Sequence, residues 1–559
     1  MPMENCKRLP IALDDPITLQ LLWNRLVFIT DQADIALGRT AFSSVIRESH
    51  DYVTVLLDRE GNSLAQCSQS IPAFIGSLPL AAKEFLKVYP LASLEPGDVL
   101  FTNDPAIGTG HLNDGVMIAP VYRRGQLVAL VGNIAHMSDV GGRPHGPDAS
   151  DLYEEGIRIP ILKLYKAGRV NQDVLDVLAA SVRMPREVMG DLQSQLAANE
   201  VMARELAAFM DEYSIDDLAP LGRVIHARSE RAMRAAIRTM PNGVYGAEVK
   251  LDGFDAELTL KVTVSVGDDT VHVDYAGSSP QVPWGINVMP HYRYAHSAYA
   301  IKCLLDPDTP NNEGCIRPIT DAAPLGSLFN PRPPAACNAR NLIGHVIPST
   351  IFKALEGVVP ERVQGDSGGA PLWVVNCVAQ DAEGRPIVAV QAFHGGQGGR
   401  ASADGNDTLS FPSNCSTTPV EMFERAVPVL IEAKELIADS GGAGRFRGGL
   451  GQRMVVRNIS GRPMHVYLGS ERVQHPPFGV AGGRSGRAGG VLRDGVAVFP
   501  KGKIALAPDQ RLTVEAPGGG GWGDPAERTR DLVARDVREG LVSAAAAESD
   551  YGGDVDDAD

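Results

Sequence analysis

Two apolar runs separated by a short polar turn predict an antiparallel hairpin in the first quarter of the chain. Residues 115–122 form the first run, the Arg-Arg-Gly sequence at 123–125 the turn, and residues 126–134 the returning run. Because the second strand of a hairpin returns the chain to the place where the first strand starts, the flanking segments 108–114 and 133–142 are expected to lie close together. These segments carry His111, Asp114, His136 and Asp139. We therefore expect the chemistry of the chain at this place.

Three of these side chains form a candidate metal site. His111 and Asp114 are three positions apart, which places both on one side of a helical or tight-turn segment, and the hairpin can bring His136 near them. Two neutral imidazoles and one carboxylate suit manganese, iron or zinc, whereas magnesium or calcium prefers more oxygen ligands. Spacing alone leaves an ordinary alternative open, in which the histidines are hydrogen-bonded structural residues.

Two further carboxylates are candidate catalytic residues. Asp139 lies three residues after His136, and it is expected either to orient that ring or to act as a general base beside the metal. Asp104 belongs to the Thr-Asn-Asp-Pro sequence at 102–105. For Asp104, capping of a turn is the favoured interpretation and catalysis the alternative.

Composition and charge exclude several classes of partner. A chain of 559 residues that is 44% hydrophobic can bury a large core and is expected to divide into two to four domains. The net charge of −16 argues against nucleic acid or an anionic membrane surface, because both bind clustered Lys and Arg. The apolar run near the N-terminus is too brief for a signal peptide, and no stretch is long enough to cross a bilayer. We therefore expect a cytoplasmic protein.

The cysteines are expected to be reduced packing residues. There are seven of them, scattered along the chain without a CxxC pair. Neither a disulfide framework nor a cysteine-rich zinc site is predicted from such a pattern. Their positions are Cys6, Cys67, Cys303, Cys315, Cys337, Cys377 and Cys415.

The order of hydrophobic patterns predicts a mixed α and β (α+β) protein of several domains. Residues 1–170 are expected to form an N-terminal mixed domain with the metal site, beginning with a core-facing helix from Asp15 to Thr40 and a hairpin over 52–66. Helical spacing over 171–240 predicts a helical insertion packed on that domain. Residues 241–530 are expected to form the strand-rich, glycine-rich part. Residues 531–559 are expected to be helical and then an acidic tail, disordered from Glu548 to Asp559.

Runs of glycine mark the C-terminal half, at residues 367–369, 394–400, 439–449 and 517–523. We expect each run to build turns between β-strands, because glycine tolerates tight backbone approach and positive φ angles. The phosphate-binding pattern GxxxxGK[ST] is absent from the chain, so we do not expect this chain to bind ATP. Weaker polar candidates in this half are His394, Arg400, Asp404 and Asp407.

A series of motifs in one order is more specific than any one of them. The motifs are Ile46–Tyr52, Gly97–Pro105, His111–Asp114, Ala135–Gly142, Tyr153–Pro160, Asn311–Gly314, Asp439–Gly449 and Pro517–Gly521. Together they resemble the hydantoinase B, or oxoprolinase B, family over roughly Asp15 to Gly552.

The resemblance implies a catalytic subunit that acts in a hetero-oligomer with a larger hydantoinase A type partner. That partner binds ATP and phosphorylates the substrate carbonyl oxygen or bicarbonate, and a small third subunit belongs to some such assemblies. Carboxylase relatives hold a manganese-like ion through a His, an Asp three residues on, and a later His, which correspond here to His111, Asp114 and His136. Manganese is therefore the expected ion, with zinc and iron as alternatives. The chain departs from the family at Met137, where relatives commonly have a second histidine, and at Asn113, where they often have proline.

The resemblance favours ATP-dependent hydrolysis of a small cyclic amide of the hydantoin, 5-oxoproline or lactam type. A metal would acidify a water or orient a substrate oxygen, and Asp139 would accept the proton. Three alternatives stay open: a subunit of an ATP-dependent ketone carboxylase, a non-catalytic scaffold subunit, and a mononuclear iron oxygenase.

Overall fold

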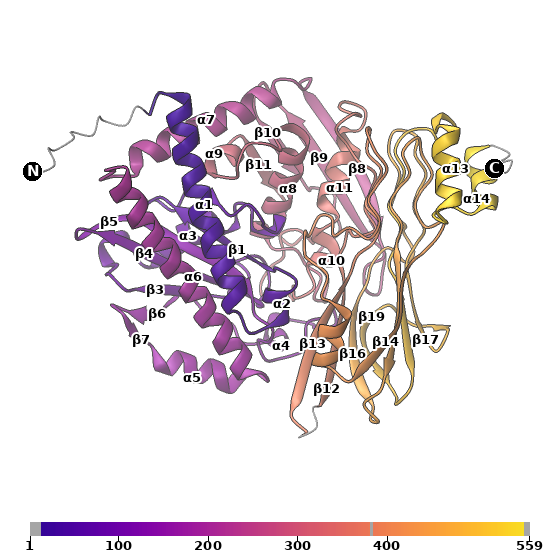
Figure 1. The fold of residues 1–559 in the computed structure, drawn as a ribbon, viewed down its shortest axis with the longest axis horizontal. Helices are drawn as coiled ribbons and strands as arrows, with labels where there is room; N and C mark the ends of the chain where they lie inside the picture. The colour runs from indigo at the N-terminus through magenta and orange to yellow at the C-terminus, as the bar shows by residue number, and fades with distance from the viewer. Residues whose placement is uncertain (1–12, 381–383, 553–559) are drawn as a thin grey trace, which may run out of the picture.

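An antiparallel sheet forms the centre of the N-terminal part (Figure 1). The computed structural model describes residues 13–380 and 384–552. The sheet has seven strands in the order β2-β1-β5-β4-β3-β6-β7. Its strands are β1 (Tyr52–Leu57), β2 (Ser63–Gln66), β3 (Val99–Thr102), β4 (Asp114–Arg123), β5 (Gln126–His136), β6 (Leu162–Lys166) and β7 (Arg169–Val170). The two hairpins predicted from sequence are β1–β2 and β4–β5.

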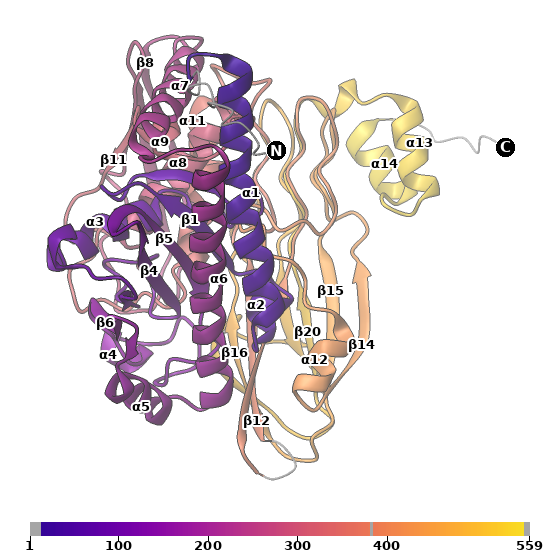
Figure 2. The same cartoon turned by 60° about the vertical axis from the view of Figure 1, so that its left-hand side comes forward.

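Two long helices, α1 (Pro16–Thr40) and α6 (Pro185–Glu212), lie side by side on one face of this sheet (Figure 2). Asp15 caps α1 by accepting from Thr18 N, and Pro16 occupies its first turn. Side chains of β1 alternate between this face and the opposite one, so both faces are buried and the strand is apolar except for Thr54. The other helices of this part are α2 (Ser44–Arg47), η1 (Pro72–Phe74), α3 (Ser77–Val88), η2 (Leu91–Ser93), α4 (Leu152–Glu155), α5 (Gln172–Ser181) and α7 (Ala219–Ile237).

A second, four-stranded sheet follows residue 241, where the chain changes from helix to strand. No separate core begins there, because the largest cluster of buried apolar side chains joins Val53 and Leu78 to Val262 and Ile351. The change from helix to strand at residue 241 thus occurs within one shared cluster of apolar side chains, and the predicted domain boundary stays a prediction. The elements are β8 (Gly243–Leu251), β9 (Leu258–Val266), β10 (Val271–Asp274), α8 (Pro290–Leu305), α9 (Glu313–Ile316), β11 (Ile319–Ala322), α10 (Asn341–Gly344) and α11 (Ile347–Leu355).

Two further sheets form a sandwich in the C-terminal part. Their inner faces enclose a separate core that includes Trp373, Phe393 and Val466. One sheet contains β12 (Trp373–Gln380), β13 (Pro386–Phe393), β16 (Met464–Gly469) and β19 (Lys501–Leu506). The other contains β14 (Val429–Leu436), β15 (Gln452–Asn458), β17 (Gly490–Arg493), β18 (Val496–Ala497) and β20 (Arg511–Glu515), and α12 (Val420–Ala426) precedes it.

The glycine runs lie side by side as extended segments outside the strands, so the prediction of turns between strands was wrong. Gly365 and Gly368 donate hydrogen bonds to the carbonyls of Gly399 and Gly396, and those two glycines donate to residues 517 and 520. The bonds recur at every third residue, which is the repeat of an extended threefold helix. At most of these positions a β-carbon would overlap the backbone of the neighbouring segment. Glycine is needed here for the close approach of backbones.

The C-terminal helices pack against these glycine segments. They are η3 (Pro525–Glu527), α13 (Arg530–Arg538) and α14 (Ala544–Tyr551). Arg528 pairs with Asp404 at 2.7 Å and with the fully buried Asp536 at 2.6 Å. These ion pairs hold the helices against the extended glycine segments, which are called the glycine layer below. The expectation of disorder from Glu548 was therefore wrong as far as Tyr551, which ends α14. Residues 553–559 lie outside the described ranges.

Two expectations from composition can be compared with the described residues. The six cysteines within the described ranges are all free, and Cys67, Cys315, Cys337 and Cys377 are buried. Cys6 lies outside those ranges. No helix between residues 13 and 552, apart from the gap at 381–383, is both long and apolar enough to span a bilayer.

The close packing of the glycine layer predicts that one added methyl group lowers stability at some glycines and not at others. Gly396→Ala is expected to destabilise the fold by about 3 kcal/mol, because its β-carbon would overlap the carbonyl of Gly449 in a rigid backbone contact. Gly490→Ala is the matched control, since a β-carbon there meets nothing within 4 Å. Chemical denaturation of both variants measures the difference. Equal stability of the two variants would contradict the packing role.

Candidate active site

The β4–β5 hairpin places Asp114 directly opposite His136. The two residues are a cross-strand pair at the open end of the hairpin, where β4 begins and β5 ends. Side chains of directly opposed residues point to the same face of a sheet and come within contact distance. Nδ1 of His136 lies 3.3 Å from Oδ1 of Asp114. The hairpin predicted from sequence is thus the element that joins the two halves of the site.

His111 completes this group from the loop that leads into β4. Its Nε2 lies 2.9 Å from the same Oδ1 of Asp114, and its Nδ1 donates to the carbonyl of Asn338 at 3.2 Å. With Nδ1 as the donor, Nε2 carries the lone pair, and this tautomer is the one a ligand histidine needs. His111, Asp114 and His136, hereafter the triad, each offer one ligand atom, and these atoms all lie within 4.8 Å of one another. The triad could hold a metal ion.

Two atoms of the triad are buried without a hydrogen-bond partner. Nε2 of His111 and Oδ1 of Asp114 face each other closely but lack hydrogen-bond geometry. Burial and the nearby Arg340 lower the pKa of His111 to about 4, so its ring is neutral. Burial opposes ionisation of Asp114, but His111, His136 and Arg340 together hold its pKa well below the usual range. A neutral nitrogen and a charged oxygen that converge without bonding fit a divalent cation.

Arg340 fixes the second oxygen of Asp114. Its Nη2 lies 3.0 Å from Oδ2 of Asp114, and Thr109 donates its hydroxyl to the same oxygen. Nε of Arg340 donates to the carbonyl of Thr109 at 2.6 Å, and the guanidinium lies over the ring of Tyr292 at 4.2 Å. The carboxylate therefore has one oxygen held by these donors and one directed at the histidines.

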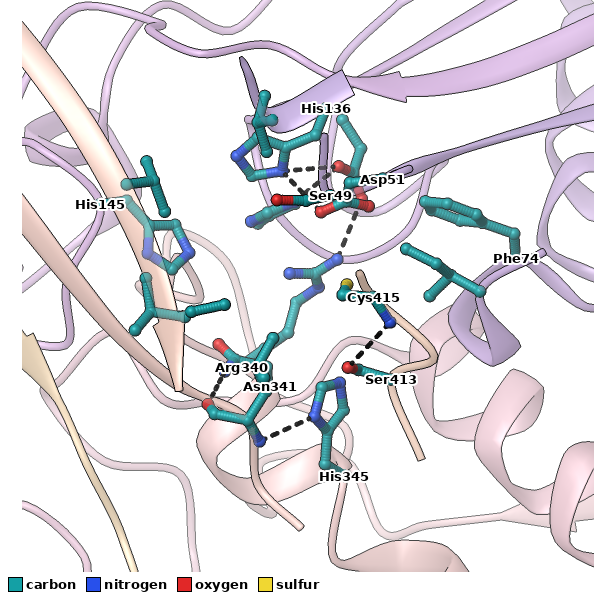
Figure 3. A pocket seen from close by; sticks show the side chains of 18 of the residues that line it. Ser49, Asp51, Phe74, His136, His145, Arg340, Asn341, His345, Ser413 and Cys415 are labelled. Carbon is teal, nitrogen blue, oxygen red and sulfur yellow. Dashed lines mark hydrogen bonds and ion pairs between the residues drawn. The ribbon is translucent and has the colours of Figure 1, made fainter. Parts of the chain in front are cut away.

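Two residues beside the triad were missed in the sequence analysis. Oδ2 of Asp51 lies 3.6 Å from Nδ1 of His136, and the ring of His145 lies 5.8 Å from that of His111. Figure 3 shows Asp51 next to His136 and His145 on the facing side of the cavity. Asp51 directly precedes β1, which pairs with β5, so sheet order would have placed it there. For His145, which comes from an irregular loop, the sequence carries no comparable signal.

These side chains line one end of a cavity of about 90 Å³. Arg340 lies in its middle, and His345, Ser413 and Cys415 lie toward the other end (Figure 3). Burial raises the pKa of Asp51 to about 6, although His136 opposes the shift. Most of the other lining side chains are apolar, and β12 and β13 of the sandwich supply part of them. The apolar wall residues are Val45, Ile71, Phe74, Leu372, Val374, Val390 and Ala392.

Comparison with known proteins assigns the family. The profile described as hydantoinase B/oxoprolinase matches residues 15–525. The chain belongs to this family. The β subunit of caprolactamase from Pseudomonas jessenii is 31% identical over 567 residues, which cover 97% of this chain and 96% of that one. The 5-oxoprolinase of Saccharomyces cerevisiae is 28% identical over 544 residues, which cover 91% of this chain and 42% of that longer protein.

Solved structures share the fold of this hydantoinase B family member. The crystal structure of the ATP-dependent caprolactamase from Pseudomonas jessenii has a TM-score of 0.89 at 30% identity, covering 97% of each chain. A nucleotide-free acetone carboxylase has a TM-score of 0.87 at 18% identity, covering 96% of this chain and 79% of that one. The second likeness shows the fold alone. The predicted α+β, multi-domain class and the family resemblance are thereby confirmed.

The two carboxylates predicted to be catalytic have protein partners of their own. Asp139 is paired with Arg183 at 2.6 Å and accepts from Gly141 N at 3.1 Å. It lines a smaller hollow on the other side of His136. Asp104 accepts from Ala106 N at 3.0 Å, in keeping with a turn cap, and neither residue lines the main cavity. Their catalytic roles stay predictions.

Glu155 supports the backbone next to the site in this hydantoinase B family member. Its buried Oε1 accepts from Cys337 N at 2.7 Å and from Asn338 N at 2.6 Å. Those residues lie three and two positions before Arg340, and Asn338 also holds the ring of His111. Burial raises the pKa of Glu155 to about 7. Glu155 therefore positions the segment that orients two of the groups of the site.

Two substitutions of Glu155 are expected to distinguish what its hydrogen bonds contribute to stability from what its charge contributes. Glu155→Ala should cost roughly 2–4 kcal/mol, because two buried N–H groups lose their acceptor, whereas Glu155→Gln keeps an oxygen for both. Because folding raises the pKa of this carboxyl, the unfolded chain releases its proton first, and stability declines as pH rises from about 4.5 toward 7. Denaturation between pH 5 and 8 should show a flatter profile for Glu155→Gln. An unchanged slope would contradict the assigned protonation.

Proposed function

We propose that this chain is the metal-dependent catalytic subunit of an ATP-dependent cyclic amide hydrolase. The observation that carries the proposal is the pair of unpartnered, buried ligand atoms on His111 and Asp114 beside His136, at the end of the cavity. The similarity to a caprolactamase β subunit supports the reaction class.

The triad would hold one divalent ion, with manganese as the first choice and zinc or iron as alternatives. When bound, such an ion supplies Lewis-acid chemistry: it polarises a carbonyl oxygen and lowers the pKa of a bound water. Asn338 orients the ring of His111 for this role, and Arg340 keeps Asp114 ionised.

Asp51 is the carboxylate placed to move a proton. Ring opening adds a water oxygen to the carbonyl carbon, breaks the bond from that carbon to the ring nitrogen, and transfers a proton from the water to the nitrogen. Asp51 lines the cavity beside the triad, whereas Asp139 is held by Arg183 behind His136. We therefore assign the proton transfer to Asp51. Asp139 would act indirectly, by fixing the position of the end of β5, where His136 lies.

ATP would be used by a partner subunit of hydantoinase A type. This chain has no GxxxxGK[ST] sequence, and the caprolactamase that it resembles is described as ATP-dependent. The yeast 5-oxoprolinase is more than twice as long as the region it shares with this chain, which leaves room there for a fused ATP-binding part. Phosphorylation of the carbonyl oxygen by the partner would activate the amide for attack in the cavity. Addition of water and cleavage of the bond to the ring nitrogen would then leave an acyl phosphate, and a second water would release it as the carboxylate and inorganic phosphate.

Metal analysis tests the triad directly. The purified protein is expected to contain about one divalent ion per chain, and His111→Ala should reduce this to well below one, because the site loses one of three protein ligands. His465→Ala is the matched control, since this exposed histidine lies on β16 outside the cavity. Elemental analysis by mass spectrometry gives the stoichiometry. A sub-stoichiometric content that His111→Ala leaves unchanged would favour a scaffold subunit.

Turnover by the reconstituted complex tests the reaction class. Co-expressed with its A-type partner, the chain should open a lactam or hydantoin ring only when ATP is present, with ADP formed in step. Ketones with bicarbonate serve as the parallel assay. A carboxylated ketone as the product would replace the hydrolase assignment by the carboxylase one. Product analysis by mass spectrometry distinguishes the two.

A further inference from the structure

His145 reaches the cavity from the loop between β5 and α4. Its ring centroid lies 5.8 Å from that of His111 and 6.1 Å from that of His136, whereas the rings of His111 and His136 are 5.2 Å apart. Figure 3 shows His145 on one side of His136 and Asp51 on the other. The three imidazoles form one compact group, in which His145 is the outermost ring.

The backbone of the loop fixes the position of His145. Its carbonyl accepts from Nδ2 of Asn376 in β12 at 2.8 Å, and Asn376 is almost fully buried. Two residues further along, the carbonyl of Pro147 accepts from Gly285 N at 2.8 Å. The loop is thus held on both sides by main-chain contacts, and the ring is presented to the cavity without using its own nitrogens.

The ring of His145 is free to bind a ligand. Neither of its nitrogens forms a hydrogen bond or an ion pair with another residue in the described ranges. The neighbouring charged groups are engaged, because Asp51 lies against His136 and Arg340 holds Asp114. An imidazole carries at least one N–H in either protonation state. His145 can therefore donate to a ligand in the cavity.

The ring separations leave room for one ligand atom between the triad and His145. Two imidazoles that share an ion through bonds of about 2.1 Å have centres roughly 5 Å apart, as the rings of His111 and His136 do. His145 lies further from both of these rings. It also lies outside the group of converging ligand atoms. An ion in the triad would therefore meet His145 through a bound oxygen atom and not through a direct bond.

We infer that His145 donates a hydrogen bond to a phosphoryl oxygen of a ligand bound at the triad. This inference rests on the proposed function, in which a phosphorylated substrate enters the cavity and inorganic phosphate is finally released there. The carboxylate of Asp51 repels an anionic ligand on its own side of His136, whereas His145 on the other side offers a donor. The phosphoryl group therefore lies toward His145, which leaves the Asp51 side for the proton transfer.

The test uses inorganic phosphate as the probe and Mn²⁺ as the probe metal. The full chain is loaded with Mn²⁺, and the Kd of phosphate is measured from the paramagnetic broadening of its ³¹P NMR signal, which reports phosphate close to the ion. His145→Ala should weaken phosphate binding about tenfold, the effect of one charge-assisted hydrogen bond, with Mn²⁺ retained. His145→Gln keeps a side-chain N–H donor and should regain most of the affinity.

Controls separate this contact from metal binding and from folding. His465→Ala, at the exposed histidine on β16, should leave the Kd of phosphate unchanged. If His145→Ala does not fold, His145→Leu takes its place, because it fills the space of the ring without a donor. An unchanged Kd in the folded variant overturns the inference. Loss of Mn²⁺ from that variant also overturns it, because His145 would then be a metal ligand.

The remaining outcomes distinguish the inference from the proposed function. A wild-type chain that binds Mn²⁺ but no phosphate near the ion overturns the inference, while the hydrolase assignment stands. Phosphate binding that depends on His145, in a chain whose complex opens no cyclic amide with ATP, overturns the hydrolase assignment and supports the inference. A wild-type chain that binds no divalent ion overturns both.

Discussion

The carboxylate of Asp114 is the interaction on which the site depends. One oxygen faces His111 and His136, and the other is held by Arg340, which is more than two hundred residues away in the sequence. The geometry requires that β4 and β5 keep one register, because a slip by a single residue would turn Asp114 to the opposite face of the sheet from His136. Both faces of this sheet are buried, so the packing of the core resists such a slip.

The short segment from residue 337 to 341 forms the other half of the site. Asn338 holds the ring of His111, Arg340 holds Asp114, and Oδ1 of Asn341 has no hydrogen-bond partner among the described residues. Glu155 fixes the beginning of this segment through two backbone N–H groups. A backbone held in this way orients the side chains of His111 and Asp114 together.

The glycine layer connects the sandwich to the rest of the molecule. Since glycine stands where the segments touch, their backbones approach closely and hydrogen-bond every third residue. The sandwich contributes Val374 and Val390 to the cavity wall. The glycines thus serve the site indirectly, through the placement of the strands that close it.

Local patterns predicted the parts of the fold that depend on residues near one another in sequence. The cap of α1 at Asp15, both N-terminal hairpins and the meeting of His111, Asp114 and His136 all follow from turn residues and hydrophobic spacing. The glycine runs were misinterpreted because glycine allows turns and close backbone packing equally, and only neighbouring segments distinguish the two. The same reason applies to the tail, whose Tyr551 is held by a packing partner that composition does not reveal.

By itself the sequence determined which ligand atoms a metal could use, since a hairpin and a three-residue spacing are local properties of the chain. Only the tertiary structure decided what surrounds them: Asp51, His145, Arg340 and Asn341 reach the cavity from separate elements. Their positions at the cavity depend on sheet order and on packing between distant segments, which local sequence patterns do not encode. The charge, the shape and the free acceptor of the cavity are therefore properties of the folded protein.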